Sequence, residues 1–198
     1  MRKKWLIVAA ALLGLGACGG IETASRAYTP GTPVAAGAVV PDYSVVALNV
    51  TVPETLKVSE ANRYYPIADI VWRGDAYGNR YQQVREIFLS GMGRGAAQMQ
   101  GGQQVIVDVE VMRFHSLTEK TRYSIGGSHS IIFSLQVRDA ATGAILQPPR
   151  IIKTELEGFG GDKALEAVRI GQTQKVRVSD HLARIIRGEL ARPYQPGA

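Results

Sequence analysis

The sequence predicts an α+β two-layer sandwich, in which a four-stranded, mainly antiparallel sheet carries two helices on one face. Alternating apolar residues mark four segments as strands, and two longer segments repeat apolar residues at helical spacing. Their order along the chain is strand, helix, strand, strand, strand, helix. Three consecutive strands joined by hairpin connections are expected to pair antiparallel.

The first strand is expected from Tyr43 to Val52, and Pro53 ends it. One side of this strand carries Ser44, Val46, Leu48, Val50 and Val52. Residues 54–78 are irregular, although a short strand around residues 68–72 fits the pattern.

The first helix is expected from Arg80 to Gln100, capped by Asn79 and ended by Gly101-Gly102. Its apolar face comprises Tyr81, Val84, Phe88, Met92, Gly95 and Met99. Gly91 and Gly95 lie one turn apart and lower the helix propensity. We expect them to permit close approach of this helix to the sheet.

Three strands are expected to follow, over residues 105–114, 128–138 and 144–156. Residues 115–127 form a long hairpin loop in this interpretation, and residues 139–143 form a tight turn. Pro148-Pro149 predicts that the last strand lies at an edge or contains a bulge.

A short helix is compatible with residues 163–169, in a glycine-rich stretch. The last helix is expected over residues 172–190 and ends before Pro193. Its apolar face comprises Val178, Leu182, Ile185 and Ile186.

The N-terminus has the pattern of a secretory signal. Arg2, Lys3 and Lys4 give a basic start, and the uncharged segment of residues 5–15 is too short to cross a bilayer as a helix. Leu15-Gly16-Ala17-Cys18 then resembles the lipobox of bacterial lipoproteins, which implies cleavage before Cys18 and its acylation, for example with palmitate. The other interpretations are an ordinary signal peptide and an uncleaved anchor.

Cys18 is the only cysteine in the chain, so no intramolecular disulfide can form. The resulting organisation is a signal peptide (1–17), a lipidated N-terminus with a flexible tether (18–42), an α+β domain (43–192) and a short tail (193–198). Gly19 follows the cysteine, and by resemblance to lipoprotein sorting signals this implies the periplasmic side of the outer membrane, with the inner membrane as the alternative.

The basic balance gives no reason to expect nucleic acid as a partner. The formal charge is +6, and loss of Arg2, Lys3 and Lys4 with the signal leaves about +3. The remaining basic residues are spread along the chain and form no cluster.

The sequence contains no set of reactive residues that points to an enzyme. His115, His129 and His181 are scattered without metal-ligand spacing, so neither a metal nor a cofactor is expected. Ser128 and Ser130 flank His129 but point to the opposite face of a strand. Asp108 and Glu110 share a strand face about 7 Å apart, where solvated surface carboxylates are the simpler interpretation.

Two features could bind a partner. One is the segment from Tyr64 to Tyr77, in which Tyr64, Tyr65, Trp72, Arg73 and Tyr77 are typical interface residues. The alternative interpretation of this segment is that Trp72 and Tyr65 close one end of the core. The other is the sheet face away from the helices, where Ile106, Met112, Phe114 and Ile132 are expected; the irregular segment could equally shield this face.

The lipobox, the tether, the segment Asn-Arg-Tyr-Tyr-Pro-Ile-Ala-Asp-Ile-Val-Trp-Arg-Gly-Asp (62–75) and the terminal basic helix together resemble a family of uncharacterised proteobacterial lipoproteins with a domain of unknown function. The element order is also similar to small lipoproteins of envelope assembly, such as those that plug the lipopolysaccharide translocon or accompany lipid-transport ABC systems. The resemblance implies no functional residue other than Cys18.

The leading hypothesis is therefore a non-enzymatic, lipid-anchored protein that binds an envelope protein partner in envelope assembly or lipid transport. The second is a protein that binds a small molecule or lipid fragment, between sheet and helices or under the aromatic segment. The third, a hydrolase, would use Asp108, Glu110 or His129.

Overall fold

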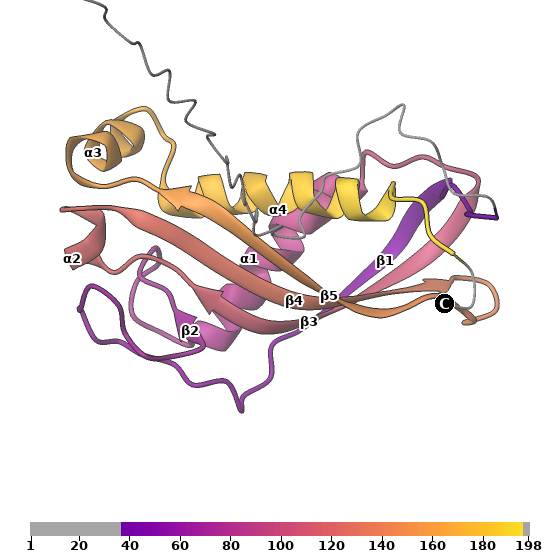
Figure 1. The fold of residues 1–198 in the computed structure, drawn as a ribbon, viewed down its shortest axis with the longest axis horizontal. Coiled ribbons are helices and arrows are strands. Elements are labelled where there is room, and N and C mark those ends of the chain that lie inside the picture. The colour runs from indigo at the N-terminus through magenta and orange to yellow at the C-terminus, as the bar shows by residue number, and fades with distance from the viewer. Residues whose placement is uncertain (1–36, 196–198) are drawn as a thin grey trace, which may run out of the picture.

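A computed structural model describes residues 37–195, in which five strands form one mixed sheet (Figure 1). They are β1 (Tyr43–Thr51), β2 (Ile70–Val71), β3 (Gln103–His115), β4 (Gly127–Asp139) and β5 (Ile145–Gly158). The order across the sheet is β1-β3-β4-β5, and β2 pairs with the last two residues of β3.

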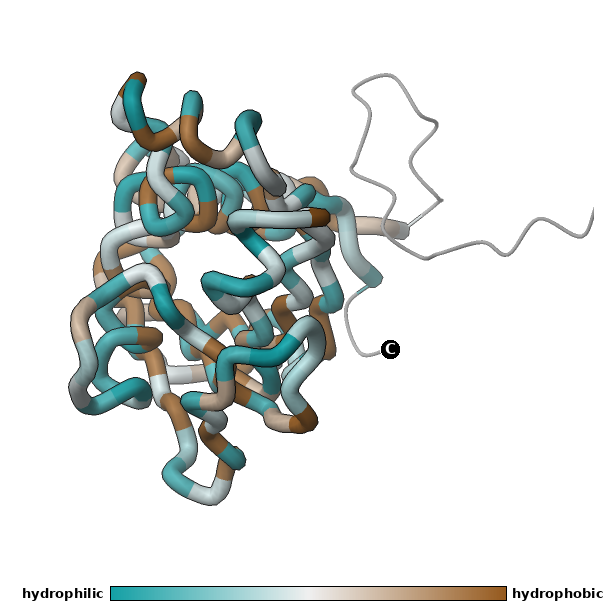
Figure 2. Tube along the Cα trace, turned by 90° about the vertical axis from the view of Figure 1, so that its left-hand side faces the viewer, coloured by the Kyte–Doolittle hydropathy of each residue, from teal (hydrophilic) through white to brown (hydrophobic). Residues whose placement is uncertain are grey.

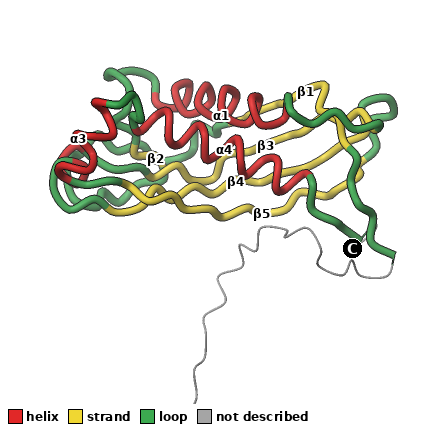
Figure 3. The backbone as a smooth tube through the Cα atoms, turned by 90° about the horizontal axis from the view of Figure 1, so that it is seen from above, coloured by secondary structure: helices red, strands yellow, loops and turns green. Residues whose placement is uncertain are grey.

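Four helices accompany the sheet in this part of the chain. They are α1 (Arg80–Ala96), α2 (Glu119–Arg122), α3 (Gly161–Arg169) and α4 (Gln174–Leu190). The long helices α1 and α4 lie side by side over one face of the sheet (Figure 3). The two-layer α+β prediction is confirmed in this respect, and the short α2 and α3 lie at one end of the sheet (Figure 1).

The predicted sheet of four mainly antiparallel strands is wrong in its details. β2 adds a fifth strand, and both β1 and β2 run parallel to β3. The cause lies in the connection, because a helix between two neighbouring strands returns the chain to the starting end of the sheet. Only β3, β4 and β5 pair antiparallel, as expected for consecutive strands joined by hairpin connections.

The predicted elements are otherwise present with boundaries that differ by a few residues. Asn79 caps α1, since its side-chain oxygen accepts a hydrogen bond from the backbone N–H of Gln82 at 3.1 Å. The short helix expected at 163–169 is α3. Helix α2 falls in the segment that the sequence predicts as a hairpin loop, and Thr118 caps it.

Two bulges change which residues face the core. Val46 is an extra residue between Val45 and Ala47, and its side chain is 53% exposed, so the single alternation predicted for β1 is wrong. A second irregularity between Val111 and Arg113 turns Phe114 into the core, where it is 1% exposed. Phe114 was expected on the open face, because each bulge reverses the alternation beyond it.

The core lies between the sheet and the helix pair. It contains Val105, Val107, Val109 and Val111 of β3, the aromatic side chains Phe88, Phe114 and Phe133, and Val178, Leu182 and Ile186 of α4. Phe88 contacts the other two phenylalanines, with ring centroids 6.0 Å and 5.7 Å away.

Gly91 and Gly95 allow close packing against α4, not against the sheet as expected. A Cβ at Gly91 would lie 2.7 Å from the carbonyl oxygen of Ser179, and one at Gly95 would collide with the carbonyl oxygen of Ala183. The two glycines in the sequence indicate that another element packs closely against α1. Which element does so depends on how the helices are arranged in the fold.

β5 is an edge strand, as its prolines predict. Its register against β4 shifts around Pro148 and Pro149, between the pairs Leu135↔Arg150 and Val137↔Gln147. Proline has no N–H to donate, so this part of the edge is a poor template for pairing with a further strand.

The two ends of the elongated sheet differ. Val39 forms a bridge with Tyr194, so the described N-terminal residues enter beside the C-terminal ones at one end (Figure 1). α2, α3 and β2 lie at the other end. No helix within residues 37–195 is long and apolar enough to cross a membrane.

Candidate functional site

The lipidation site predicted at Cys18 lies outside the described residues, as does most of the tether. The other candidate residues fall within the described part of the chain. They belong to three places: the aromatic segment, which we define as residues 62–77, the open face of the sheet, and a cavity at the end of the molecule that holds α2 and α3.

The aromatic segment divides into buried and exposed residues. Trp72 is 0% exposed and packs edge-on against Phe114, with ring centroids 5.5 Å apart. Its indole Nε1–H donates a hydrogen bond to the Asp75 carboxylate at 2.8 Å. Trp72 therefore closes the core, as the alternative interpretation holds, and offers no surface to a partner.

The tyrosines of this segment remain at the surface. Tyr64, Tyr65 and Tyr77 are 51%, 67% and 85% exposed, and Ile67 is 97% exposed. Figure 2 views this end of the molecule and shows hydrophobic positions (brown) in peripheral turns as well as in the interior. Tyr65 also stacks on His115, with ring centroids 4.5 Å apart, and so covers one end of the open sheet face.

Buried side chains fix the backbone of the segment from below. The hydroxyls of Thr118 and Thr121 donate to the carbonyl oxygens of Arg63 and Tyr64, at 2.7 Å and 2.8 Å. The carbonyl oxygen of Pro66 lies 2.9 Å from His115 Nε2. The loop is thereby attached at three backbone carbonyl groups to side chains at the start of α2 and the end of β3.

Arg73 belongs to an ion-pair network. Its guanidinium contacts Glu60 and Glu119, both at 2.8 Å. Glu60 also binds the Arg80 guanidinium at 2.6 Å, and the Arg80 side chain is only 3% exposed. Hydrogen bonds from Arg80 hold the pKa of Glu60 below its usual value. Arg73 is thus a structural tie between the irregular segment and α2, and its guanidinium is already occupied.

The open face of the sheet carries charge pairs and scattered apolar groups. Asp108 accepts hydrogen bonds from Arg138 at 2.6 Å and from Asn49 at 2.8 Å, and the contact with Arg138 lowers the pKa of its carboxyl. Met112 is 40% exposed on this face. Asp108 and Glu110 lie opposite the helix side of the sheet, where His129 is buried, so the three residues considered for hydrolysis do not converge.

His129 takes part in a buried chain of hydrogen bonds. Gln174 Nε2–H donates to Ser116 Oγ at 2.6 Å, and Ser116 Oγ lies 2.7 Å from His129 Nδ1. Ser116 can then donate its own hydroxyl proton to Nδ1, which leaves the imidazole proton on Nε2. No sequence pattern pairs these residues, since they come from three elements that only the fold brings together.

This geometry argues against a catalytic serine. Ser116 is 3% exposed, and no carboxylate among residues 37–195 orients the imidazole. Burial lowers the pKa of His129 to about 3, and the positive charge of Arg177 acts in the same direction. Such an imidazole is a weak general base near neutral pH.

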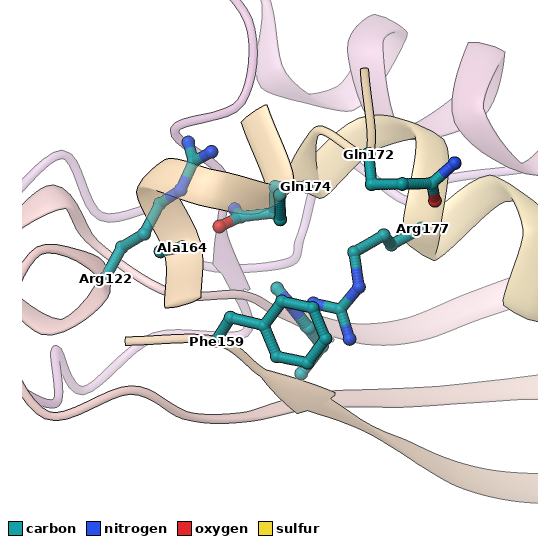
Figure 4. A pocket seen from close by; sticks show the side chains of 8 residues that line it. Arg122, Phe159, Ala164, Gln172, Gln174 and Arg177 are labelled. Carbon is teal, nitrogen blue, oxygen red and sulfur yellow. The ribbon is translucent and has the colours of Figure 1, made fainter. Parts of the chain in front are cut away.

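A cavity lies next to His129 at this end of the molecule (Figure 4). It is small, with about 10 Å³ open to the centre of a water-sized sphere, which is room for roughly one water molecule. Besides His129 it is lined by Arg122, Arg177, Gln174, Phe159 and Ala164. The guanidinium carbon of Arg177 lies 3.3 Å from the centroid of the Phe159 ring, which screens one side of the cavity.

The described residues contain no group of three or more His, Cys, Asp or Glu side chains that could hold a metal ion.

A comparison with protein families finds one family whose model covers the folded domain of the chain. The model of a "Family of unknown function (DUF6778)" matches residues 43–198. The chain belongs to this family. The sequence suggested a domain of unknown function, and membership of DUF6778 confirms this. Membership by itself assigns no activity. None of the curated proteins matches the chain.

Several solved structures are similar to this DUF6778 chain at low identity. A DUF330 protein from Xanthomonas campestris is 11% identical, with a TM-score of 0.43, over 80% of this chain and 90% of that one. A minor lipoprotein from Acinetobacter baumannii is 12% identical, with a TM-score of 0.33, over 77% and 95%. PelC from Paraburkholderia phytofirmans, crystallised as a dodecamer, is 13% identical, with a TM-score of 0.33, over 78% and 95%. At these scores the likenesses carry no functional argument.

Proposed function

We propose that this DUF6778 protein is a lipid-anchored envelope protein that works by binding a protein partner, without catalysis, and that the exposed part of the aromatic segment is its binding surface. The observation that carries the proposal is a set of exposed apolar side chains on a loop whose backbone is fixed. This set comprises Tyr64, Tyr65 and Ile67.

Preorganisation is the reason that this loop is suited to binding. Binding normally requires the ordering of loops and side chains, which lowers the affinity. Here Thr118, Thr121 and His115 already hold the backbone of residues 63–66 in place. The tyrosine rings are partly held as well, because Arg113 donates a hydrogen bond to the Tyr65 hydroxyl at 2.8 Å and the Lys120 ammonium lies 4.6 Å from the Tyr64 ring centroid.

The composition of the surface supports a protein partner. Tyrosine and large aliphatic side chains are typical anchors at the centre of protein interfaces. Ile67, at 97% exposure, contributes nothing to the core, so its burial by a partner would add roughly 1.5–3 kcal/mol of hydrophobic free energy to binding, before the cost of association.

The position of the surface is compatible with an anchor at the N-terminus. Residue 39 lies at the end of the sheet beside Tyr194, whereas the aromatic segment lies at the end that holds β2 (Figure 1). Lipidation of Cys18 would therefore tether the protein through the end of the sheet that lies opposite the aromatic segment. This arrangement suits a role in envelope assembly or lipid transport.

A photo-crosslinking amino acid at position 67 tests the proposal in living cells. We expect one discrete crosslinked product, which Tyr65→Ala abolishes. The matched control places the crosslinker at position 145, where Ile145 is 59% exposed near the opposite end of the sheet. Absence of a product at position 67, or the same product from both positions, would contradict the proposal.

A further inference from the structure

Positively charged side chains lie beside the exposed tyrosines of the aromatic segment. Arg63 and Lys120 are exposed, and neither side chain forms an ion pair within residues 37–195. The Lys120 ammonium lies 4.6 Å from the centroid of the Tyr64 ring. Arg63 precedes Tyr64 in the chain, and the Thr118 hydroxyl fixes its carbonyl oxygen. Two cations therefore flank Tyr64, and no carboxylate of the described chain neutralises them.

Arg113 adds a third cation beside Tyr65, and the fold already orients its guanidinium. Arg113 donates hydrogen bonds to the Tyr65 hydroxyl at 2.8 Å and to the carbonyl oxygen of Ala68 at 3.3 Å. These contacts leave further N–H groups of the guanidinium for an incoming acceptor. Arg113 also forms no ion pair with another described residue. Because the side chain is already held, it loses less entropy when an anion binds to it.

The acidic side chains of the same region are mostly neutralised by other residues. Those of residues 57–77 and of α2 are Glu60, Asp69, Asp75 and Glu119. All except Asp69 form ion pairs with arginine or lysine. The Asp69 carboxylate accepts the backbone N–H of Lys57 at 2.9 Å. The cations beside the two tyrosines, which we call the basic rim (Arg63, Arg113 and Lys120), therefore outnumber the one carboxylate that pairs with no cation.

We propose that the protein partner has an acidic surface, whose carboxylates bind the basic rim around the exposed tyrosines; this rests on the partner-binding role proposed above. Arginine binds a carboxylate through two parallel hydrogen bonds, and tyrosine and arginine are enriched at the energetic centres of interfaces. Charges on the rim of an interface attract a partner of opposite charge and repel others. Anionic lipid would attract the same residues, but the chain enters the fold at the opposite end of the sheet (Figure 1), which favours a protein.

Charge reversal in the full-length protein, with the photo-crosslinker at position 67, tests the proposal in cells. We expect Arg63→Glu with Lys120→Glu to lower the yield of the crosslinked product at least about tenfold, because two attractive contacts become repulsive. Arg184→Glu with Arg192→Glu is the matched control and should leave the yield unchanged. Both control residues are exposed and form no ion pair within residues 37–195, and the change in net charge is the same.

Two further measurements separate charge from folding. The neutral pair Arg63→Gln with Lys120→Gln should give a smaller loss of product than the charge reversal. In membranes isolated from the same cells, high salt before irradiation should lower the yield from the unsubstituted rim, because salt screens exposed charges.

The outcomes distinguish this proposal from the partner-binding role itself. A discrete protein product whose yield responds to neither charge reversal nor salt would overturn the acidic partner and leave the partner-binding role intact. Crosslinking to phospholipid in place of protein would overturn it in favour of an anionic membrane. Absence of any product would overturn the binding surface, and the acidic partner with it.

Discussion

Gly95 in α1 lies so close to the carbonyl oxygen of Ala183 in α4 that no space remains for a methyl group. Gly91 is in the same position one turn earlier, against Ser179. The two glycines therefore set the distance between the two helices that cover the sheet, and a change in that distance would disturb the core beneath them.

Gly95→Ala should destabilise the protein, whereas Gly93→Ala should not. The added methyl group at position 95 forces α1 and α4 apart, at a cost of roughly 1–3 kcal/mol in the free energy of unfolding. Nothing lies within 4 Å of a Cβ at Gly93, so alanine there should stabilise the helix by roughly 1 kcal/mol. Urea denaturation followed by circular dichroism measures both. Equal effects of the two substitutions would show that the helix contact is looser than described.

Glu60→Gln should loosen the aromatic segment more than Glu119→Gln. Glu60 is the carboxylate that pairs with Arg80, whose side chain is 3% exposed, and it also pairs with Arg73. Loss of this charge should lower the free energy of unfolding by roughly 1.5–3 kcal/mol. Glu119 pairs with Arg73 alone, which retains Glu60, so the loss should stay below about 1 kcal/mol.

Hydrogen exchange locates this effect. Amides of residues 59–78 should exchange faster in Glu60→Gln, while amides of β4 should keep their protection. Uniformly faster exchange in both regions would instead indicate global destabilisation and would refute a local role for the ion pairs.

Acidification should destabilise the protein through His129. Burial lowers the pKa of this histidine from 6.5 to about 3, so between these values the unfolded chain binds a proton that the folded chain does not. Stability is therefore complete above pH 6.5 and falls as the pH decreases, with a slope of at most about 1.4 kcal/mol per pH unit from this group. Denaturant unfolding between pH 7.5 and 5 measures the slope.

His129→Asn is the matched variant for this measurement, because its side-chain oxygen can still accept the hydrogen bond from Ser116. Its slope should be smaller than that of the wild type. It should not vanish, because burial also lowers the pKa of His115 and His181. An unchanged slope would mean that His129 takes up its proton as readily in the folded protein as in the unfolded chain.

Cys18→Ala should release the protein from membranes. The wild type should incorporate radiolabelled palmitate and sediment with the membrane fraction, and the variant should do neither, because the acyl chains predicted on Cys18 would supply the membrane affinity. Equal sedimentation of both forms would point to an uncleaved signal as the anchor. Labelling of the variant would exclude Cys18 as the acceptor.

The aromatic segment illustrates what sequence patterns can and cannot predict about the site. Its composition indicates a functional surface, but Trp72 turns out to be core and Ile67 surface. An irregular loop has no periodicity from which to read the direction of a side chain, so exposure there depends on what the loop packs against. The Ser116–His129–Gln174 chain could not be predicted at all, because its members come from segments that meet only in the fold.

The order and type of the long elements and the apolar faces of α1 and α4 could be predicted from the sequence, because helical and strand periodicities are local properties of the chain. The signal sequence predicted at the N-terminus also rests on local charge and apolar length, and it stays a prediction. The tertiary structure decided the parallel pairing of β1 and β2 with β3, the faces beyond each bulge, and the contact of Gly91 and Gly95 with α4. It also brought Arg122, Arg177 and His129 around one cavity. These features depend on which distant segments become neighbours, and that is fixed by packing around the common core.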